Sequence, residues 1–413
     1  MDEDYPIVAV APFVVTLLCI AILPLATPHW WEHNRNKAIV IAAIAAPMAA
    51  WLGLAHAQAL VHSLHEYASF LMLLAALFVV SGGIFLEGDL EAKPGTNVAI
   101  LAVGAVLANV VGTTGASMVL IRLILRTNRQ RERVAHLPFF FILIVSNCGG
   151  LLTPLGDPPL FLGYLRGVPF EWTATLWPVW IMSVGYLLAA CWIVDRREYA
   201  QETALVRERD IEEKLPLRVR GWIHVPLLGC VVAAVFLPTP WRELAMGAVA
   251  TVSYLVGKPA LREQNGFSFG PIVEVAVLFA GIFVTMVPAL ELLRAHGADL
   301  GLTSPWHFFL TTGGLSSVLD NAPTYLTLLS AAQSLPLAEE VVGIPDVYLA
   351  AISTGAVLMG ANTYIGNGPN FMVKAIADSS GYRTPSFFRY AAAALVTLLP
   401  VYVMVLAYLT WVR

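Results

Sequence analysis

Long runs of apolar residues, separated by short polar stretches, make up most of this chain. Many of them approach 20 residues, the approximate length of helix that crosses the hydrocarbon core of a bilayer. The uninterrupted runs lie at about 6–26, 38–55, 67–86, 174–194, 224–237, 244–256, 272–293 and 390–411. This pattern predicts an all-α polytopic membrane protein.

Two further apolar runs are broken at a depth where a helix should cross. The first, 137–164, contains SNCGGLLTPLGDPP (146–159), with three Gly, three Pro, the amide of Asn147 and the carboxylate of Asp157. The second is broken at 360–370. Backbone groups at membrane depth need partners, so such breaks persist only inside protein or beside a water-filled cavity. Secondary transporters place their substrate and ion sites at broken helices of this kind.

Two pairs of short apolar arms predict re-entrant hairpins, because each arm is too short to cross the membrane alone. The arms of the first hairpin are 99–107 and 116–125, and its tip lies at about 109–115. The second hairpin covers 306–329.

The two halves of the chain contain the same parts in the same order. The hairpin tips LANVVGT (107–113) and LDNAPTY (319–325) align, and the breaks align if the first half has five extra residues. This alignment pairs Asn109 with Asn321, Asn147 with Asn362 and Asp157 with Asn367. Each half is predicted to have five crossings, one of them the broken helix, and one hairpin. An odd number of crossings makes the second half an inverted repeat of the first.

A charged linker separates these repeats. The predicted units are a first inverted repeat at 1–194, a linker at 195–221 with seven Lys or Arg and seven Asp or Glu, and a second inverted repeat at 222–413. The segment 122–133 adds five Arg. Cytoplasmic loops carry an excess of Lys and Arg, so we expect both segments to be cytoplasmic and both termini to lie on the other side.

Composition agrees with the membrane prediction. Of the 413 residues, 58% are hydrophobic and 13% are charged, against about 25% charged in a soluble domain. The four cysteines lie in apolar segments without metal-ligand spacing, which indicates neither a disulfide framework nor a zinc site. The acidic start MDEDYP argues against a cleaved signal peptide. No glycine-rich phosphate-binding loop is present, which argues against an ATP-driven pump.

The candidate chemistry depends on two acids, Asp157 and Asp320, which are the carboxylates in the breaks and hairpin tips. An ionised Asp at the centre of a membrane helix costs about 2.5–3.5 kcal/mol, so such a residue is usually functional or paired. Either could bind Na⁺ or a proton. The alternative is that both only cap helices, since Asp is a preferred N-cap and Pro is favoured in the first turn.

Neutral polar residues at the breaks and tips would complete an ion site, or would only satisfy backbone groups there. The candidate ligands of this kind are Asn109, Asn147, Asn321, Asn362, Asn367, Thr113, Thr153 and Thr363.

Three motifs, LSSVLDNAP, GGLLTPLGDPP and GANTYIGNGPN, resemble the ArsB/NhaD branch of the ion transporter superfamily. That group includes NhaD-like sodium/proton antiporters, arsenite permeases and citrate or dicarboxylate carriers. The resemblance implies a homodimer, with a scaffold domain holding a moving domain of hairpins and broken helices. The dicarboxylate carriers have Ser-Asn-Thr at both tips, whereas this chain has ANVVGTT and LDNAPT.

These features agree with three classes of function to different degrees. Acids without basic residues in the breaks favour a multi-pass cation/proton antiporter of the cell (inner) membrane that moves Na⁺ and H⁺. The alternative is a carrier of a di- or tricarboxylate or an arsenite-type oxyanion, bound at helix N-termini. An intramembrane enzyme or a non-transporting scaffold is disfavoured, because no catalytic constellation is present. We expect the lipid bilayer, a second copy of the chain and a small ion as partners, and neither a cofactor nor nucleic acid.

Overall fold

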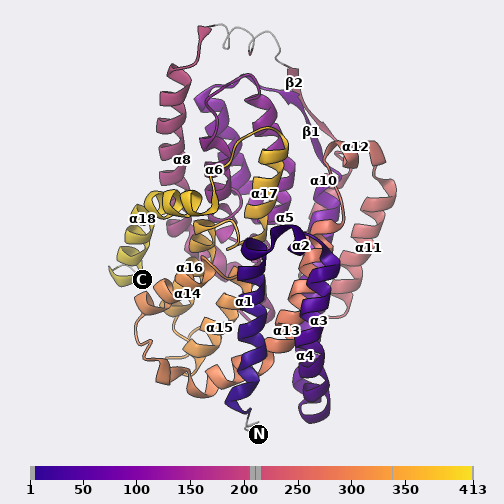
Figure 1. Cartoon of the computed structure of the whole chain (residues 1–413), viewed down its shortest axis with the longest axis vertical. Coiled ribbons are helices and arrows are strands. Elements are labelled where there is room, and N and C mark those ends of the chain that lie inside the picture. The colour runs from indigo at the N-terminus through magenta and orange to yellow at the C-terminus, as the bar shows by residue number, and fades with distance from the viewer. Residues whose placement is uncertain (1–4, 205–209, 211–214, 337, 412–413) are drawn as a thin grey trace.

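Helices form nearly all of the molecule, and a computed structural model describes residues 5–204, 210, 215–336 and 338–411. Figure 1 shows the helices running mainly along the long axis of the molecule. The elements of the first half are η1 Ile7–Val10, α1 Ala11–Ala26, α2 Pro28–Trp31, α3 Asn34–Ala55, α4 Ala57–Ser81, β1 Phe85–Asp89, α5 Pro94–Thr127, α6 His136–Ile144, η2 Cys148–Leu151, α7 Pro158–Leu165, η3 Phe170–Leu176 and α8 Trp177–Ala200.

The second half repeats this helical character. Its elements are β2 Leu215–Arg220, α10 His224–Ala234, α11 Trp241–Val256, α12 Pro259–Gln264, α13 Gly270–His296, η4 Gly297–Leu300, α14 Pro305–Ser316, α15 Asn321–Gln333, α16 Asp346–Met359, η5 Gly360–Asn362, α17 Gly368–Ser379 and α18 Phe387–Trp411. The linker prediction falls partly on residues 205–209 and 211–214, which lie outside the described part, as do the first four residues.

Length and hydropathy confirm the polytopic all-α membrane fold. The helical segments of the described chain that are long and apolar enough to cross a membrane are Ile7–Ala26, Asn34–Ala55, Ala57–Ser81, Pro94–Thr127, Phe170–Ala200, Gly270–Leu300 and Phe387–Trp411. The 11 residues of α10 extend only about 16 Å at 1.5 Å per residue. The expected five crossings per half therefore remain a prediction.

The segment Pro94–Thr127 is a helical hairpin, which we call hairpin 1. The helix is interrupted at Gly112, whose positive φ of 77° is a backbone angle that favours glycine. The two arms lie side by side, because Asn97 and Asn128 exchange amide hydrogen bonds of 3.0 and 2.7 Å at its base. Hairpin 2 consists of α14 and α15. Gly297, just before its first arm, lies against Ala331 near the end of its second.

A two-stranded antiparallel sheet departs from the all-α expectation. Strand β1 lies where the third crossing was expected to end, and β2 lies in the charged linker. Their register places Glu87 opposite Arg218, and Arg220 forms an ion pair with Glu87 at 3.2 Å. The alternation in LPLRVR (215–220) fits a strand with one polar face.

The helices form two packed groups. In one, α4 packs against α10, α11 and α13, and α3 packs against α13. In the other, the hairpins pack with α6, α7, α8, α16 and α17, which surround the two breaks. Within the first group, hydroxyl groups of α4 donate to α13 carbonyls, Ser63 to Phe283 at 2.5 Å and Tyr67 to Ala276 at 2.8 Å. These bonds join α4 firmly to α13.

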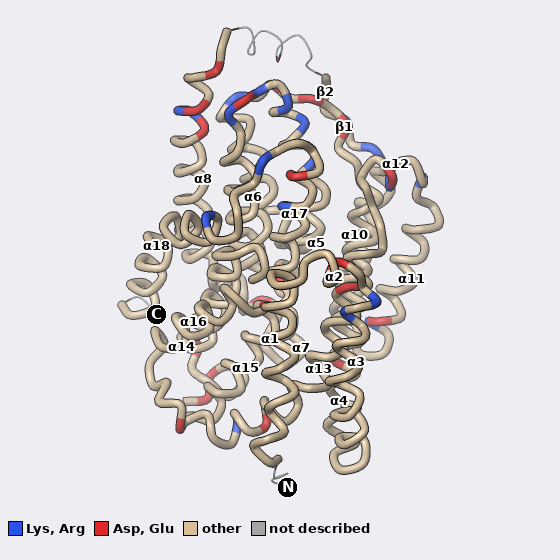
Figure 2. The backbone as a smooth tube through the Cα atoms, in the orientation of Figure 1, with Lys and Arg blue, Asp and Glu red and all other residues tan. Residues whose placement is uncertain are grey.

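Charged residues gather at the two ends of the molecule. Figure 2 shows most Lys and Arg at the end that carries α12 and the sheet, a smaller charged group beside α2 and α3, and mainly uncharged helices elsewhere in the middle. Residue Tyr5 and the start of α4 lie at the opposite end, where Tyr5 stacks on His56. We call these the basic end and the N-terminal end.

Candidate functional site

The first broken helix runs through α6, η2 and α7, and its irregular part, residues 145–157, is break 1. Asp157 has extended backbone angles directly before α7, and Pro158 and Pro159 open that helix. A Cβ atom on Gly156 would lie 2.0 Å from the carbonyl oxygen of Gly150. Because only glycine allows this approach, the two residues let the chain fold back and place Asp157 at the start of α7.

The second broken helix has the same construction at residues 360–367, which we call break 2. A Cβ atom on Gly366 would lie 2.6 Å from the carbonyl oxygen of Gly360, six residues earlier as in break 1. Asn367 then occupies the extended position before α17 that Asp157 occupies before α7.

Asp157 lies at the meeting point of both hairpins and both breaks. Its Oδ1 accepts hydrogen bonds from Thr113 Oγ1 of hairpin 1 at 2.9 Å and from Asn367 Nδ2 of break 2 at 3.0 Å. Its Oδ2 accepts one from Asn321 Nδ2 of hairpin 2 at 2.5 Å. The carboxylate is 1% exposed, and each of these partners is neutral.

A chain of amides extends this site between the two breaks. Asn367 Nδ2 also donates to Asn147 Oδ1 at 3.1 Å, and Asn147 Nδ2 donates to Asn370 Oδ1 at 2.7 Å. Asn370 Nδ2 in turn donates to the carbonyl of Thr363 at 2.9 Å. All but Thr363 are at least 98% buried, so these amides replace water as partners for the broken backbone.

Asn109 and Thr153 connect hairpin 1 to break 1 rather than reaching Asp157. Asn109 Nδ2 donates to the Gly149 carbonyl at 2.7 Å, and its Oδ1 accepts from the backbone N–H of Leu152 at 2.8 Å. Thr153 Oγ1 donates to the Asn109 carbonyl at 2.5 Å. These residues hold the hairpin tip against the break.

Matching contacts connect hairpin 2 to break 2. Thr363 Oγ1 donates to the Ser317 carbonyl at 2.5 Å, and Asn362 Nδ2 donates to Ser317 Oγ at 2.9 Å. Asn362 Oδ1 also accepts from Tyr402 of α18 at 2.8 Å. Ser317 in hairpin 2 therefore does what Asn109 does in hairpin 1.

These contacts correct the alignment of the two halves. Thr153 corresponds to Thr363 and Gly156 to Gly366 without a gap, so Leu152 rather than Asn147 is the counterpart of Asn362. In the hairpins the counterpart of Asn321 is Thr113, since both donate to Asp157. The expected pairing of Asp157 with Asn367 agrees with the structure. The other pairings were wrong because they matched identical residue types instead of equivalent contacts.

Asp320 has a different role in the structure from Asp157. It is the N-cap of α15, and its Oδ1 accepts from the backbone N–H of Ala322 at 3.0 Å. It is partly exposed, and among the described residues this cap is the hydrogen bond that its side chain makes. The capping interpretation therefore describes Asp320, whereas Asp157 receives its three bonds from other segments.

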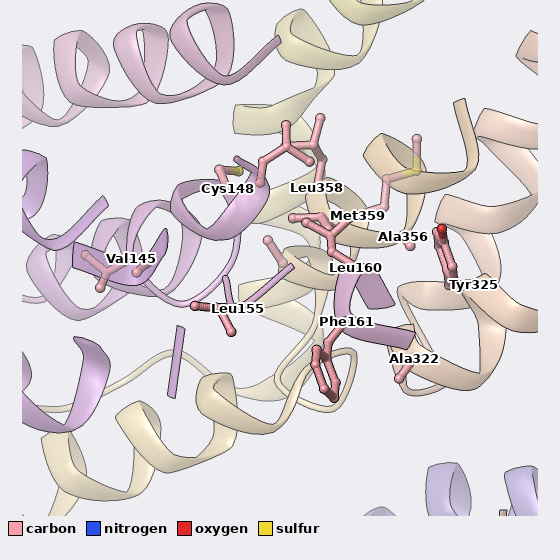
Figure 3. Packing of buried hydrophobic residues seen from close by; sticks show 14 of the residues in the cluster. Val145, Cys148, Leu155, Leu160, Phe161, Ala322, Tyr325, Ala356, Leu358 and Met359 are labelled. Carbon is pink, nitrogen blue, oxygen red and sulfur yellow. The ribbon is translucent and has the colours of Figure 1, made fainter. Parts of the chain in front are cut away.

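The surroundings of the site are apolar. Figure 3 shows Leu155, Leu160 and Phe161 of the first broken helix near Ala322 of hairpin 2 and Met359 of α16. All five are at least 95% buried. A cavity of about 60 Å³ lies between residues 111–115 of the hairpin 1 tip, residues 155–158 of the first broken helix, and apolar side chains of α4 and α13. Electrostatic interactions are strong in such an environment, so a bound ion would be held firmly.

One polar atom of the site lacks a partner. Among the described residues, Asn321 Oδ1 makes no hydrogen bond although the side chain is fully buried. The described chain has no group of three or more His, Cys, Asp or Glu that would hold a transition metal. One carboxylate with amide and hydroxyl oxygens is instead suited to a hard monovalent cation or a proton.

The sequence-based list missed three contact residues, Asn370, Ser317 and Tyr402. Asn370 lies in the motif GANTYIGNGPN and Ser317 in LSSVLDNAP. Their positions beside the break and the hairpin tip could have identified them as candidate contact residues. Tyr402 lies in an unbroken apolar helix, where the sequence gives no sign of its contact with Asn362.

A buried polar site between two broken helices and two hairpins defines a multi-pass membrane protein with the architecture of secondary transporters. A family model described as "Putative citrate transport" matches residues 2–411. The chain belongs to this family and is a secondary transporter. The family match does not show whether the chain is a sodium/proton antiporter, so its membership of the NhaD-like branch remains a prediction. No curated protein matches the chain.

Proposed function

We propose that Asp157 binds an exchangeable cation, a proton or Na⁺, and that this exchange drives transport. The observation that carries this proposal is a fully buried carboxylate whose three side-chain donors, Thr113, Asn321 and Asn367, come from three different segments and are all neutral. A cation bound here replaces the missing positive charge, and its arrival or departure changes contacts in both hairpins at once.

The side-chain amide of Asn321 can interact with Asp157 when that carboxyl group is ionised, protonated or bound to Na⁺. With an ionised Asp157 it donates from Nδ2, as in the structure. With a protonated Asp157, a turn of the amide lets its Oδ1, otherwise without a partner among the described residues, accept the carboxyl proton. With bound Na⁺, the same oxygen and the carboxylate provide two hard ligands. Thr113 and Asn367 adjust around the same carboxylate.

The distribution of Lys and Arg supports an orientation for the transport cycle. The basic end is placed in the cytoplasm and the N-terminal end outside, in agreement with the bias of cytoplasmic loops. The hairpin bases then face opposite sides: hairpin 1 opens toward the basic end, and hairpin 2 opens toward the N-terminal end. We propose the cell (inner) membrane as the location and two inverted repeats as the basis for alternating access.

The transported substrate in this proposal is a small carboxylate of the citrate class. The family description favours it over cation/proton exchange alone. The starts of α7, α15 and α17 all lie at the site, because Asp157 and Asn367 directly precede α7 and α17, and Asn321, the first residue of α15, donates to Asp157. Helix N-termini stabilise anions, and a cation on Asp157 would remove the repulsion between this carboxylate and the substrate. Pure cation/proton antiport is the second candidate, supported by the neutral partners of Asp157.

Transport in proteoliposomes separates the two candidates. Purified protein is reconstituted with a pH-sensitive dye inside, and Na⁺ or radiolabelled citrate is added alone and together. Citrate uptake that depends on a Na⁺ or proton gradient supports the carboxylate carrier. Proton movement with Na⁺ alone, without citrate uptake, supports the antiporter. Citrate uptake that neither gradient affects would contradict the role of Asp157.

A further inference from the structure

A cavity lined by both charged and apolar side chains lies at the N-terminal end, away from Asp157. Its volume is about 460 Å³, within the range of about 300–1,000 Å³ typical of small-molecule sites. It is bounded by the first turns of α4, by the chain after α7 and by the last turns of α13. The charged or titratable side chains that line it are His62, Arg166, Glu291 and Arg294.

Arg166 forms a close ion pair with Glu66 beside this cavity. Its Nε and a terminal nitrogen lie 2.5 and 2.8 Å from the two carboxylate oxygens, so the contact is bidentate. The side chains are 15% and 7% exposed. His62 lies 3.3 Å from the same carboxylate, and Arg294 contacts Glu291 at 3.0 Å. Two guanidinium groups thus face one cavity, each held by an acid of the protein.

This ion pair joins the two groups of helices. Arg166 directly follows α7, and Asp157 directly precedes the same helix, while Glu66 belongs to α4, which is bonded to α13 through Ser63 and Tyr67. A change at Arg166 therefore acts on the helix that begins at the cation site.

We propose that the cavity is an entry site for a di- or tricarboxylate anion, in which a substrate carboxylate replaces Glu66 on Arg166. This inference rests on the proposed carboxylate substrate. The guanidinium fork binds any carboxylate in the bidentate geometry that it now makes with Glu66. Arg294 lines the same cavity and binds a second carboxylate of the anion.

The exchange keeps Arg166 paired with a carboxylate throughout. Glu66 leaves Arg166 and is hydrated from the cavity or pairs with His62, and the anion takes its place. The contact between α4 and α7 opens only when an anion is present to hold Arg166. Anion entry is in this way coupled to release of the helix that carries Asp157.

Neutral variants at Glu66 and Arg166 test this exchange. Purified protein in detergent is titrated with citrate, and the dissociation constant is taken from the rise in melting temperature. Glu66→Gln removes the competing carboxylate and should tighten citrate binding several-fold. Arg166→Gln should weaken it at least tenfold. The same changes should appear in the KM for citrate uptake.

The double variant Glu66→Gln with Arg166→Gln guards against misfolding, because it leaves no buried charge unpaired. It should fold and bind citrate as weakly as Arg166→Gln alone. Glu87→Gln and Arg220→Gln, which separate an ion pair at the basic end, should leave citrate binding unchanged.

A purely structural ion pair gives the opposite pattern: both single variants shift stability in the same direction, the double variant recovers it, and citrate affinity stays constant. That result would overturn the entry site. Absence of citrate binding to the wild type would also overturn it. The cation site at Asp157 is tested independently, by measuring whether sodium-dependent proton release requires Asp157.

Discussion

Replacing Asp157 in two ways measures how much its hydrogen bonds contribute to the fold. Asp157→Asn keeps a side-chain oxygen that can accept from Thr113 and Asn367 at the Oδ1 position. The new amide nitrogen would face Asn321, which can turn and accept with its own Oδ1. Asp157→Ala removes every acceptor. Both variants remove the charge, so the cost of burying an ion cancels when they are compared.

The expected difference in unfolding free energy between the Asn and Ala variants follows from the hydrogen bonds that the Ala variant loses. In the Ala variant Thr113 and Asn321 lose the acceptor that each has among the described residues, whereas Asn367 still donates to Asn147. A buried group left without a partner costs about 1–3 kcal/mol, so the Ala variant should be less stable than the Asn variant by roughly 2–6 kcal/mol.

Unfolding of the purified variants in detergent by heat or denaturant measures this difference. Asp299→Asn, at a carboxylate that is 83% exposed, controls for the removal of a carboxylate elsewhere. Equal stability of the Asn and Ala variants would refute the proposed bonding around Asp157. An Asn variant that fails to fold would show that the site requires the charge for its structure.

Three further substitutions test other parts of the fold. Gly156→Ala should unfold or inactivate the protein, because its Cβ atom would overlap the Gly150 backbone, whereas Gly185→Ala has open space and should be neutral in thermal melts. Asp195→Ala should destabilise by about 1.5–3 kcal/mol, because it removes the closer of two buried carboxylates that pair with Arg131, at 2.6 Å, and leaves Glu202 at 3.7 Å; a change under 1 kcal/mol in denaturant unfolding would contradict this. Asp320→Ala should cost about 0.5–2 kcal/mol through its lost helix cap, while Asp320→Asn should match the wild type in melting and in cation-dependent transport.

The helices and their breaks were predictable from the sequence because hydrocarbon imposes strict rules on the backbone. Long apolar runs predicted α1, α3, α13 and α18, and the Gly and Pro clusters located both breaks. The short sheet was missed because its two strands lie far apart in the sequence, so the alternation in the linker did not reveal a pairing partner.

The site was predicted only in part. Asp157, Asn321, Asn367 and Thr113 were all on the candidate list, and the structure brings them together. Sequence position could not separate Asp157 from Asp320, because both precede helices and differ only in what the folded chain places around them. Long-range contacts decide which acid is buried among donors and which is only a cap, and one sequence does not contain them.

Proton release on sodium binding tests the cation site most directly. Sodium chloride is added to purified protein in weakly buffered detergent solution at several pH values, with choline chloride as the control. A carboxylate ligand must lose its proton to bind a metal ion, so the wild type should release up to about one proton for each chain. Asp157→Asn should release none, and Asp320→Asn should behave like the wild type. Equal release from wild type and Asp157→Asn would contradict the assignment of the exchangeable cation to Asp157.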